Sequence, residues 1–230
     1  MTARWLVLLL TAFLMLTGFE QEQLEDRIQA LEEKEEELND AEVWETEDLE
    51  AITFDRDLED MSYHEWMDAQ ETAAYFHEES EGDFKEDWSL FLVTKALEKD
   101  IDPHIVYELL RIETGDTFDP DLVGPETQYG HAYGLGQFMK NTAPWMAEKA
   151  GLPYEHSLLY NPYYSMELTV TYLDYLYEEY GDWDNALTAY HRGKGGLAAY
   201  KEENGTARSW YAEDIQVEAA EQKELAARGD

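Results

Sequence analysis

Apolar residues recur at helical spacing through the second half of the chain. Between residues 101 and 112, Leu109 and Leu110 stand three and four positions after Val106, so on a helix the three share one face. Few segments alternate apolar and polar residues as an exposed strand does. The pattern therefore predicts a mainly α domain, with room for one small hairpin.

Start and stop signals divide this half of the chain into helices. Pro following Asp or Asn is typical of a helix start, and Gly is typical of a helix end. The long Gly-rich connection at 115–140 separates the first two helices, and loops of that length in compact domains usually carry function. The signals are Asp102-Pro103 for the first helix, Asn161-Pro162 to Gly181 for the second, and Asp184 to Gly193 for the third.

The first half of the chain has a different pattern. Trp5–Phe19 is mostly apolar and uncharged, which favours an uncleaved membrane anchor or, alternatively, a cleaved signal peptide. Residues 19–88 contain 28 acidic and four basic residues, which indicates a solvated stalk that is helical or disordered. A short heptad seam within residues 20–40 predicts weak self-association through a coiled coil.

Charge and composition exclude several classes of function. The 230 residues carry a formal net charge of −37, and no Lys/Arg cluster offers a surface for nucleic acid. The chain has no cysteine, and its six histidines show no metal-ligand spacing, so we expect neither a metal nor another cofactor.

Glu113 is the strongest candidate for chemistry. It continues the stripe of Leu109 and Leu110, where a carboxyl group is costly to ionise. The partial negative charge at a helix C-terminus also disfavours the anion. Both effects raise the pKa, and a carboxylic acid that stays protonated near neutral pH can act as a general acid. The alternative is a half-exposed glutamate at a frayed helix end.

Two further motifs follow Glu113 in a set order. At this spacing the chain resembles the catalytic domain of soluble lytic transglycosylases, relatives of goose-type lysozymes, whose pattern is Glu-Ser, then Gly-Leu-Met-Gln, then Ala-Tyr-Asn-x-Gly. The resemblance covers residues 90–205. The matching segments here are Glu113-Thr114, Gly134-Leu135-Gly136-Gln137 and Ala189-Tyr190-His191-Arg192-Gly193.

The chain departs from the family pattern at three positions. Thr114 replaces Ser and keeps a hydroxyl. Gly136 replaces Met, which we expect to remove a side chain from the wall of the cleft. His191 replaces Asn and introduces a group that titrates near neutral pH. None of these changes removes the acid, so they bear on substrate preference more than on chemistry.

The resemblance implies a lysozyme-like fold and a lyase that acts on peptidoglycan. Glu113 would protonate the β-1,4 bridge between N-acetylmuramic acid and N-acetylglucosamine, then act as the base that closes a 1,6-anhydro ring. Substrate contacts are expected from Thr114, Tyr133, Gly134, Gln137, Tyr190 and His191. Two alternatives stay open: a muramidase, if a loop acid activates water, and a non-catalytic wall-binding or scaffold protein.

These expectations give a domain map. Residues 1–19 are a signal anchor or signal peptide, 20–87 an acidic stalk, 88–212 the catalytic domain and 213–230 an acidic helical tail. The partners would be peptidoglycan strands and, through the N-terminal segment, a membrane. The protein is therefore expected outside the cytoplasm, either as a single-pass membrane protein or secreted to the cell wall.

Overall fold

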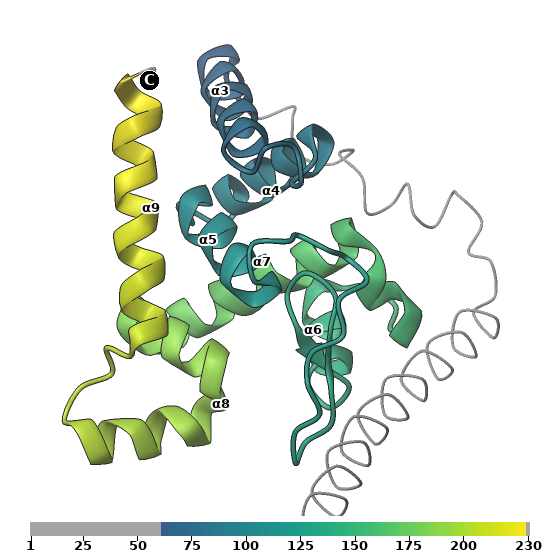
Figure 1. Ribbon diagram of the computed structural model, residues 1–230, viewed down its shortest axis with the longest axis vertical. Coiled ribbons are helices and arrows are strands. Elements are labelled where there is room, and N and C mark those ends of the chain that lie inside the picture. The colour runs from purple at the N-terminus through teal and green to yellow at the C-terminus, as the bar shows by residue number, and fades with distance from the viewer. Residues whose placement is uncertain (1–60, 229–230) are drawn as a thin grey trace, which may run out of the picture. The chain divides into compact units, whose positions relative to one another are not determined.

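The structure is a computed structural model that describes residues 61–228, and within them the chain is mainly helical, as the apolar pattern predicts (Figure 1). The only sheet in this part of the chain is a two-stranded one. The elements are α3 (Tyr63–Glu79), α4 (Glu86–Glu98), α5 (Pro103–Thr114), β1 (Ala132–Tyr133), β2 (Phe138–Met139), α6 (Ala143–Ala150), the 3-10 helix η1 (His156–Tyr160), α7 (Pro162–Tyr180), α8 (Trp183–Asn204) and α9 (Trp210–Arg228).

Local sequence signals explain where two of the central helices begin and end. Asp102 accepts a hydrogen bond from the backbone N–H of His104 at the start of α5, and Gly115 ends that helix in the left-handed conformation. At α7, Asn161 accepts a hydrogen bond from the backbone N–H of Tyr164 at the start of the helix, and Gly181 ends the helix in the left-handed conformation. The predicted boundaries of both helices are therefore confirmed.

The third predicted helix differs in its cap. Its cap is Asp182, whose carboxylate accepts from the backbone N–H of Asn185, while the Asp184 carboxylate accepts from Gln216 on α9. Gly193 ends the first helical segment of α8, as predicted, because its backbone (φ 69°, ψ 165°) is not helical. A second helical segment follows this kink and continues to Asn204.

The core surrounds α5, which packs between α4 and α9. Helix α3 joins the same core from the other side, where Phe76 stacks on Tyr107 with ring centroids 4.3 Å apart. Both of these side chains are fully buried. Aromatic residues upstream of residue 88 therefore pack onto the domain, and the composition change at that residue does not mark the edge of the packed structure.

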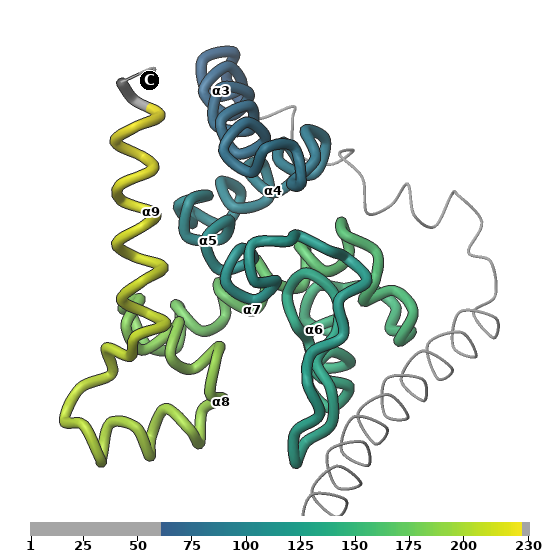
Figure 2. Tube along the Cα trace, viewed as in Figure 1, coloured from purple at the N-terminus to yellow at the C-terminus, as the bar shows by residue number. Residues whose placement is uncertain are grey.

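Helix α9 runs antiparallel to α5 (Figure 2). The two helices are in contact along most of the length of α5. Near its start Tyr211 reaches Glu113, and farther along Gln222 reaches the buried Glu108. Lys223 forms an ion pair with Asp102 at the beginning of α5, with Nζ and Oδ2 2.6 Å apart. The segment expected as an acidic tail is therefore helical and braces α5.

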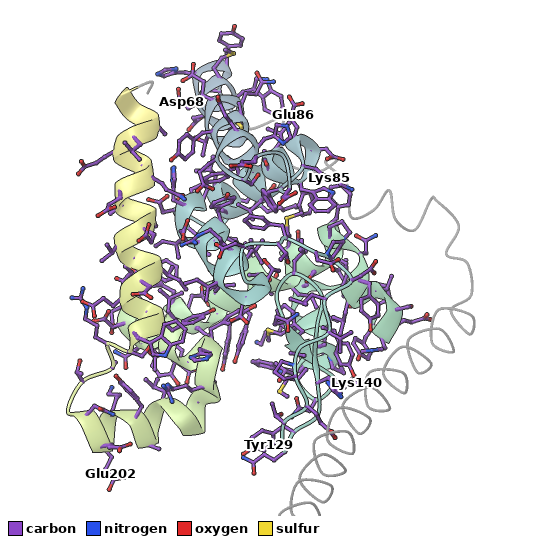
Figure 3. All side chains as sticks on the ribbon, in the orientation of Figure 1. Asp68, Lys85, Glu86, Tyr129, Lys140 and Glu202 are labelled. Atoms are coloured by element: carbon purple, nitrogen blue, oxygen red, sulfur yellow. The ribbon has the colours of Figure 1, made fainter. Side chains whose placement is uncertain are left out.

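The Gly-rich connection contains the predicted hairpin and a longer arm. Strands β1 and β2 pair antiparallel, with Tyr133 opposite Phe138. Before them the chain folds back on itself, because the N–H of Gly124 donates to the carbonyl of Ala132 at 2.8 Å. Tyr129 lies at the tip of the arm, where 69% of it is exposed (Figure 3).

The predicted anchor at Trp5–Phe19 and the heptad seam lie outside the described residues. Among residues 61–228, no helix combines the length and the apolar content that crossing a bilayer requires. Anchoring and self-association therefore stay predictions.

Candidate active site

Glu113 lies on the last turn of α5, at the end of the stripe that the sequence predicts. Val106, Leu109 and Leu110 of that stripe are fully buried. Glu113 itself is half-buried, with its carboxyl group enclosed by protein while part of the residue remains accessible. The left-handed Gly115 turns the chain away directly after it, so the site lies at a helix end.

Tyr211 holds the carboxyl group of Glu113. Its hydroxyl donates a hydrogen bond to Oε1 of Glu113 at 2.6 Å, and the Tyr211 side chain is almost completely buried. Burial raises the pKa of Glu113 to about 7, although the hydrogen bond from Tyr211 favours the anion and opposes part of the shift. The protonated and ionised forms of Glu113 are therefore both populated near neutral pH.

Tyr190 connects the glycine segment to α8 beside Glu113. Its hydroxyl donates to the carbonyl of Gly136 at 2.8 Å. Burial is the main reason that the pKa of Tyr190 lies well above its usual value, and the charge of Glu113 raises it further. Tyr190 thus lies within electrostatic reach of the carboxyl group, while Tyr211 makes the direct hydrogen bond.

Two glycines allow the segment from Gly134 to Gln137 to pack tightly. Gly134 has a positive φ of 71°, and a Cβ placed there would lie 1.9 Å from the carbonyl oxygen of Leu159. A Cβ on Gly136 would lie 2.3 Å from Oγ1 of Thr169 and 2.7 Å from the ring of Phe138. The space beside Gly136 is therefore filled by Thr169 and Phe138, and the expected effect of the missing side chain on the cleft wall stays a prediction.

Gln137 directs its amide into its own loop. Nε2 donates to the carbonyls of Gly134 at 2.8 Å and Leu122 at 3.3 Å. Its backbone is left-handed, with φ 48°, which turns the side chain back. In this arrangement the two hydrogen bonds hold the loop in shape, and a contact between Gln137 and substrate stays a prediction.

Thr114 also has a local role. Its hydroxyl donates to the carbonyl of Leu110 at 2.8 Å and accepts from the N–H of Phe118 at 3.1 Å. These bonds fix the exit of the chain from α5, directly behind Glu113. The side chain is buried, so a direct substrate contact of Thr114 stays untested.

His191 and Tyr133 contact different aromatic residues. His191 stacks on Tyr211, with ring centroids 4.6 Å apart and an angle of 13° between the planes. Partial burial and the nearby Arg192 lower the pKa of His191. Tyr133 is buried, and its ring meets His156 edge-on at 4.2 Å. His191 therefore touches the site through Tyr211, and Tyr133 packs at the hairpin; the predicted substrate contacts of both residues stay predictions.

The acidic residues of the loop are exposed and do not contribute to the raised pKa of Glu113. Asp116 forms an ion pair with Arg111, with Oδ1 and Nη1 2.6 Å apart. Asp119 accepts a hydrogen bond from the N–H of Asp121. Among residues 61–228, no three His, Asp or Glu side chains group as metal ligands would.

Sequence reasoning missed Tyr211. It stands 98 residues after Glu113 and outside the three motifs, so its role follows only from the packing of α9 on α5. The sequence carries one local signal for this segment, a serine at the start of a helix that opens with two aromatic residues, Trp210 and Tyr211. In the structure the Ser209 hydroxyl accepts from the N–H of Ala212 at 3.3 Å.

Comparisons with known proteins identify the family of the chain. Residues 92–212 match the family described as the Transglycosylase SLT domain, which is more than half of the chain and includes Glu113, Tyr190 and Tyr211. A search of curated proteins finds no match.

Among solved structures, the chain is similar to an inactive mutant of lytic transglycosylase Slt from Pseudomonas aeruginosa, with 20% identity and a TM-score of 0.48. The alignment covers 84% of this chain and 34% of that one, so the chain spans about a third of the length of Slt. The family model matches more than half of the residues, and on that ground the chain belongs to the Transglycosylase SLT domain family.

Proposed function

We propose that this protein is a peptidoglycan lytic transglycosylase in which Glu113 is the single acid and base. The reaction would break the β-1,4 bond between N-acetylmuramic acid and N-acetylglucosamine and leave a 1,6-anhydromuramoyl end. The observation that carries the proposal is an enclosed carboxyl group with a pKa of about 7, held by a tyrosine hydroxyl. Membership of the family supports the class of substrate.

The reaction balances with one carboxyl group. Protonated Glu113 gives its proton to the bridging oxygen while the bond from that oxygen to C1 breaks. The carboxylate then takes the proton of the muramoyl O6 hydroxyl as O6 bonds to C1, which returns Glu113 to its starting form and consumes no water. The acetamido oxygen of the same sugar would stabilise the positive charge at C1, in place of the second carboxylate of ordinary glycosidases.

A pKa near 7 suits a group that changes role within one turnover. A much lower value would leave too little acid for the first step, and a much higher value would make the proton hard to release between the two steps. Tyr211 fits both states, because its hydroxyl can donate to the carboxylate and remain close to the acid. The exposed loop acids support no second catalytic carboxylate.

The test is a digest of purified peptidoglycan sacculi with the full chain, followed by mass spectrometry. We expect anhydromuramoyl products, which are lighter than hydrolysis products by one water, and their loss in Glu113→Gln. Glu126→Gln, which makes the same change at an exposed loop acid, is the matched control and should retain activity. Products that carry only reducing-end muramic acid would make the protein a muramidase. Wall binding without any product would make it a non-catalytic protein.

This function places the protein where peptidoglycan lies, outside the cytoplasmic membrane. Trp5–Phe19 would hold it there as an anchor, with the acidic segment as a spacer. Cell fractionation should find the full chain in the membrane and a chain without residues 1–19 outside that fraction. Equal partition of the two would remove the anchor from the proposal.

A further inference from the structure

The rings of His191 and Tyr211 are stacked beside Glu113. Their centroids are 4.6 Å apart, and the angle between their planes is 13°. Trp210 meets both rings edge-on, at centroid distances of 5.5 Å to His191 and 5.7 Å to Tyr211. The hydroxyl of Tyr211 donates to Oε1 of Glu113, so only the Tyr211 ring separates the imidazole from the carboxyl group.

The main chain at the start of α9 is held by a contact that does not involve His191. The hydroxyl of Thr188 on α8 donates to the carbonyl of Ala207 at 2.6 Å and lies 2.7 Å from the hydroxyl of Ser209. Thr188 and Ser209 are both fully buried. Thr188 and His191 stand three positions apart and so share one face of α8. One face of α8 therefore contacts both the main chain before Tyr211 and the ring of Tyr211.

The plane of the Tyr211 ring decides where its hydroxyl hydrogen points. The phenolic oxygen lies on the axis of the Cβ–Cγ bond, so rotation about that bond leaves the oxygen in place. The O–H bond prefers the plane of the ring, and the same rotation therefore turns the hydrogen away from Glu113. A hydrogen bond weakens steeply as its angle departs from linear, even at a distance of 2.6 Å. The torsion itself is broad for tyrosine, so the plane must be fixed by neighbouring groups.

We propose that His191 is a positioning residue, whose ring holds the Tyr211 ring in the plane from which the hydroxyl donates to Glu113. Rotation of the Tyr211 ring would drive its edge into the imidazole 4.6 Å away, so the stack resists it. The effect of this contact on catalysis rests on the proposed function. The contact requires a flat ring in the place of His191 and no charge.

The charges around the stack agree with a role for the neutral imidazole. Within the described part of the chain, Arg192 acts on His191, and Glu113 and Tyr190 act on Tyr211. Partial burial and Arg192 both lower the pKa of His191, so its ring is mostly neutral at pH 7. Burial and the charge of Glu113 raise the pKa of Tyr211 well above its usual value, so its hydroxyl keeps the proton that it donates.

The pKa of Glu113 reports the direction of the Tyr211 hydroxyl without turnover. Carbon-13 NMR of the full chain with labelled glutamate side chains gives this pKa, and the signal that Glu113→Gln removes identifies Glu113. His191→Ala should raise the pKa of Glu113, because the hydrogen bond that favours the anion weakens. The pH optimum for release of products should move upward, with a loss of rate at pH 7 of about threefold to tenfold.

Three further variants separate the ring contact from other effects of the substitution. His191→Asn, which has no ring and carries the residue of the family pattern, should give the same shift if His191→Ala does not fold. His191→Phe keeps a flat ring without a titratable group and should restore the parent pKa and rate. His64→Ala removes an exposed histidine from α3 and should match the parent. Thermal unfolding of each variant shows whether it is folded.

A double variant tests the route of the effect. In Tyr211→Phe no hydroxyl remains to be directed, so adding His191→Ala should leave the pKa of Glu113 where Tyr211→Phe alone puts it. A further shift of the same size as in the parent would show that His191 acts by another route, and would overturn the positioning role.

The remaining outcomes distinguish this inference from the proposed function. An unchanged pKa of Glu113 in a folded His191→Ala or His191→Asn variant overturns the positioning role. It is also overturned if His191→Phe shifts the pKa as much as His191→Ala does, since the imidazole would then act through its nitrogen atoms. If the parent chain releases no products from sacculi, the proposed function fails, and the pKa measurements still decide whether His191 positions Tyr211.

Discussion

The fold opposes the ionisation of Glu113, and this has a consequence for stability. The unfolded chain releases the proton of Glu113 near pH 4.5, whereas the folded chain keeps it until about pH 7. Between these values the folded state binds more protons than the unfolded state, so the contribution of Glu113 to stability falls as the pH rises and is fully unfavourable above pH 7.

Glu113→Gln should therefore stabilise the protein while it abolishes activity. At pH 8 we expect a gain in the free energy of unfolding of about 3 kcal/mol, because the amide needs no proton to be neutral. At pH 4 the variant and the parent should be nearly equal. Urea unfolding at both pH values gives the difference, and Glu126→Gln at an exposed loop position serves as control. Equal stability of Glu113→Gln and parent at pH 8 would contradict the raised pKa.

Tyr211→Phe tests the second residue of the site. Loss of the hydroxyl removes the bond that favours the anion, so the pKa of Glu113 should rise and the pH optimum should move upward. We expect the rate at neutral pH to fall about tenfold, as removal of one hydrogen bond to a charged group commonly does. The measurement is a pH–rate profile. Tyr200→Phe, which removes a hydroxyl from α8 away from Glu113, should keep the parent profile, and an unshifted optimum in Tyr211→Phe would argue against the role of Tyr211.

At the scale of elements, two glycines with the same backbone conformation allow the cost of backbone strain to be measured separately from the cost of a steric clash. Gly134 and Gly151 have φ values of 71° and 70°, but only Gly134 has a neighbour, the Leu159 carbonyl, in the space of a Cβ. Gly151→Ala should cost about 1 kcal/mol through backbone strain alone. Gly134→Ala should cost at least about 2 kcal/mol and lower activity, because the loop must move. If urea unfolding shows the same loss of free energy of unfolding for both variants, the contact between Gly134 and Leu159 of η1 does not constrain the loop.

Helix α9 stabilises α5 through a buried acid. Glu108 is completely buried and is held by Arg111 at 2.8 Å and by Gln222 of α9 at 2.5 Å. Gln222→Ala leaves Glu108 with fewer partners and should lower the free energy of unfolding by about 1–3 kcal/mol. Gln128→Ala in the exposed arm is the matched control, with no effect expected. If both variants unfold at the same urea concentration, the contact between Gln222 and Glu108 contributes little.

At the scale of the whole molecule, the sequence predicts what local signals determine. Asp102 and Gly115 mark the two ends of α5, and they can be found in the sequence because caps and left-handed turns depend on neighbouring residues. The apolar stripe of the same helix then locates Glu113. Asp182 and Asp184 offer equivalent carboxylates two positions apart, and in the structure Asp182 caps α8 while Asp184 accepts a hydrogen bond from Gln216 of α9.

Contacts between distant segments could not be predicted in this way. The inward turn of Gln137 depends on the carbonyl of Leu122, and the filling of the space at Gly136 depends on Thr169 from another helix. The pairing of Tyr211 with Glu113 depends on the placement of α9 against α5. These are the interactions that set the acid strength and the shape of the site, and they come from packing rather than from motifs.

Helix α9 touches α5 at the carboxyl group of Glu113 through Tyr211 and at Glu108 through Gln222, three turns farther along α9. A rotation of α9 about its axis would break both of these hydrogen bonds together. The placement of α9 therefore governs both the acid strength of Glu113 and the packing of the buried Glu108.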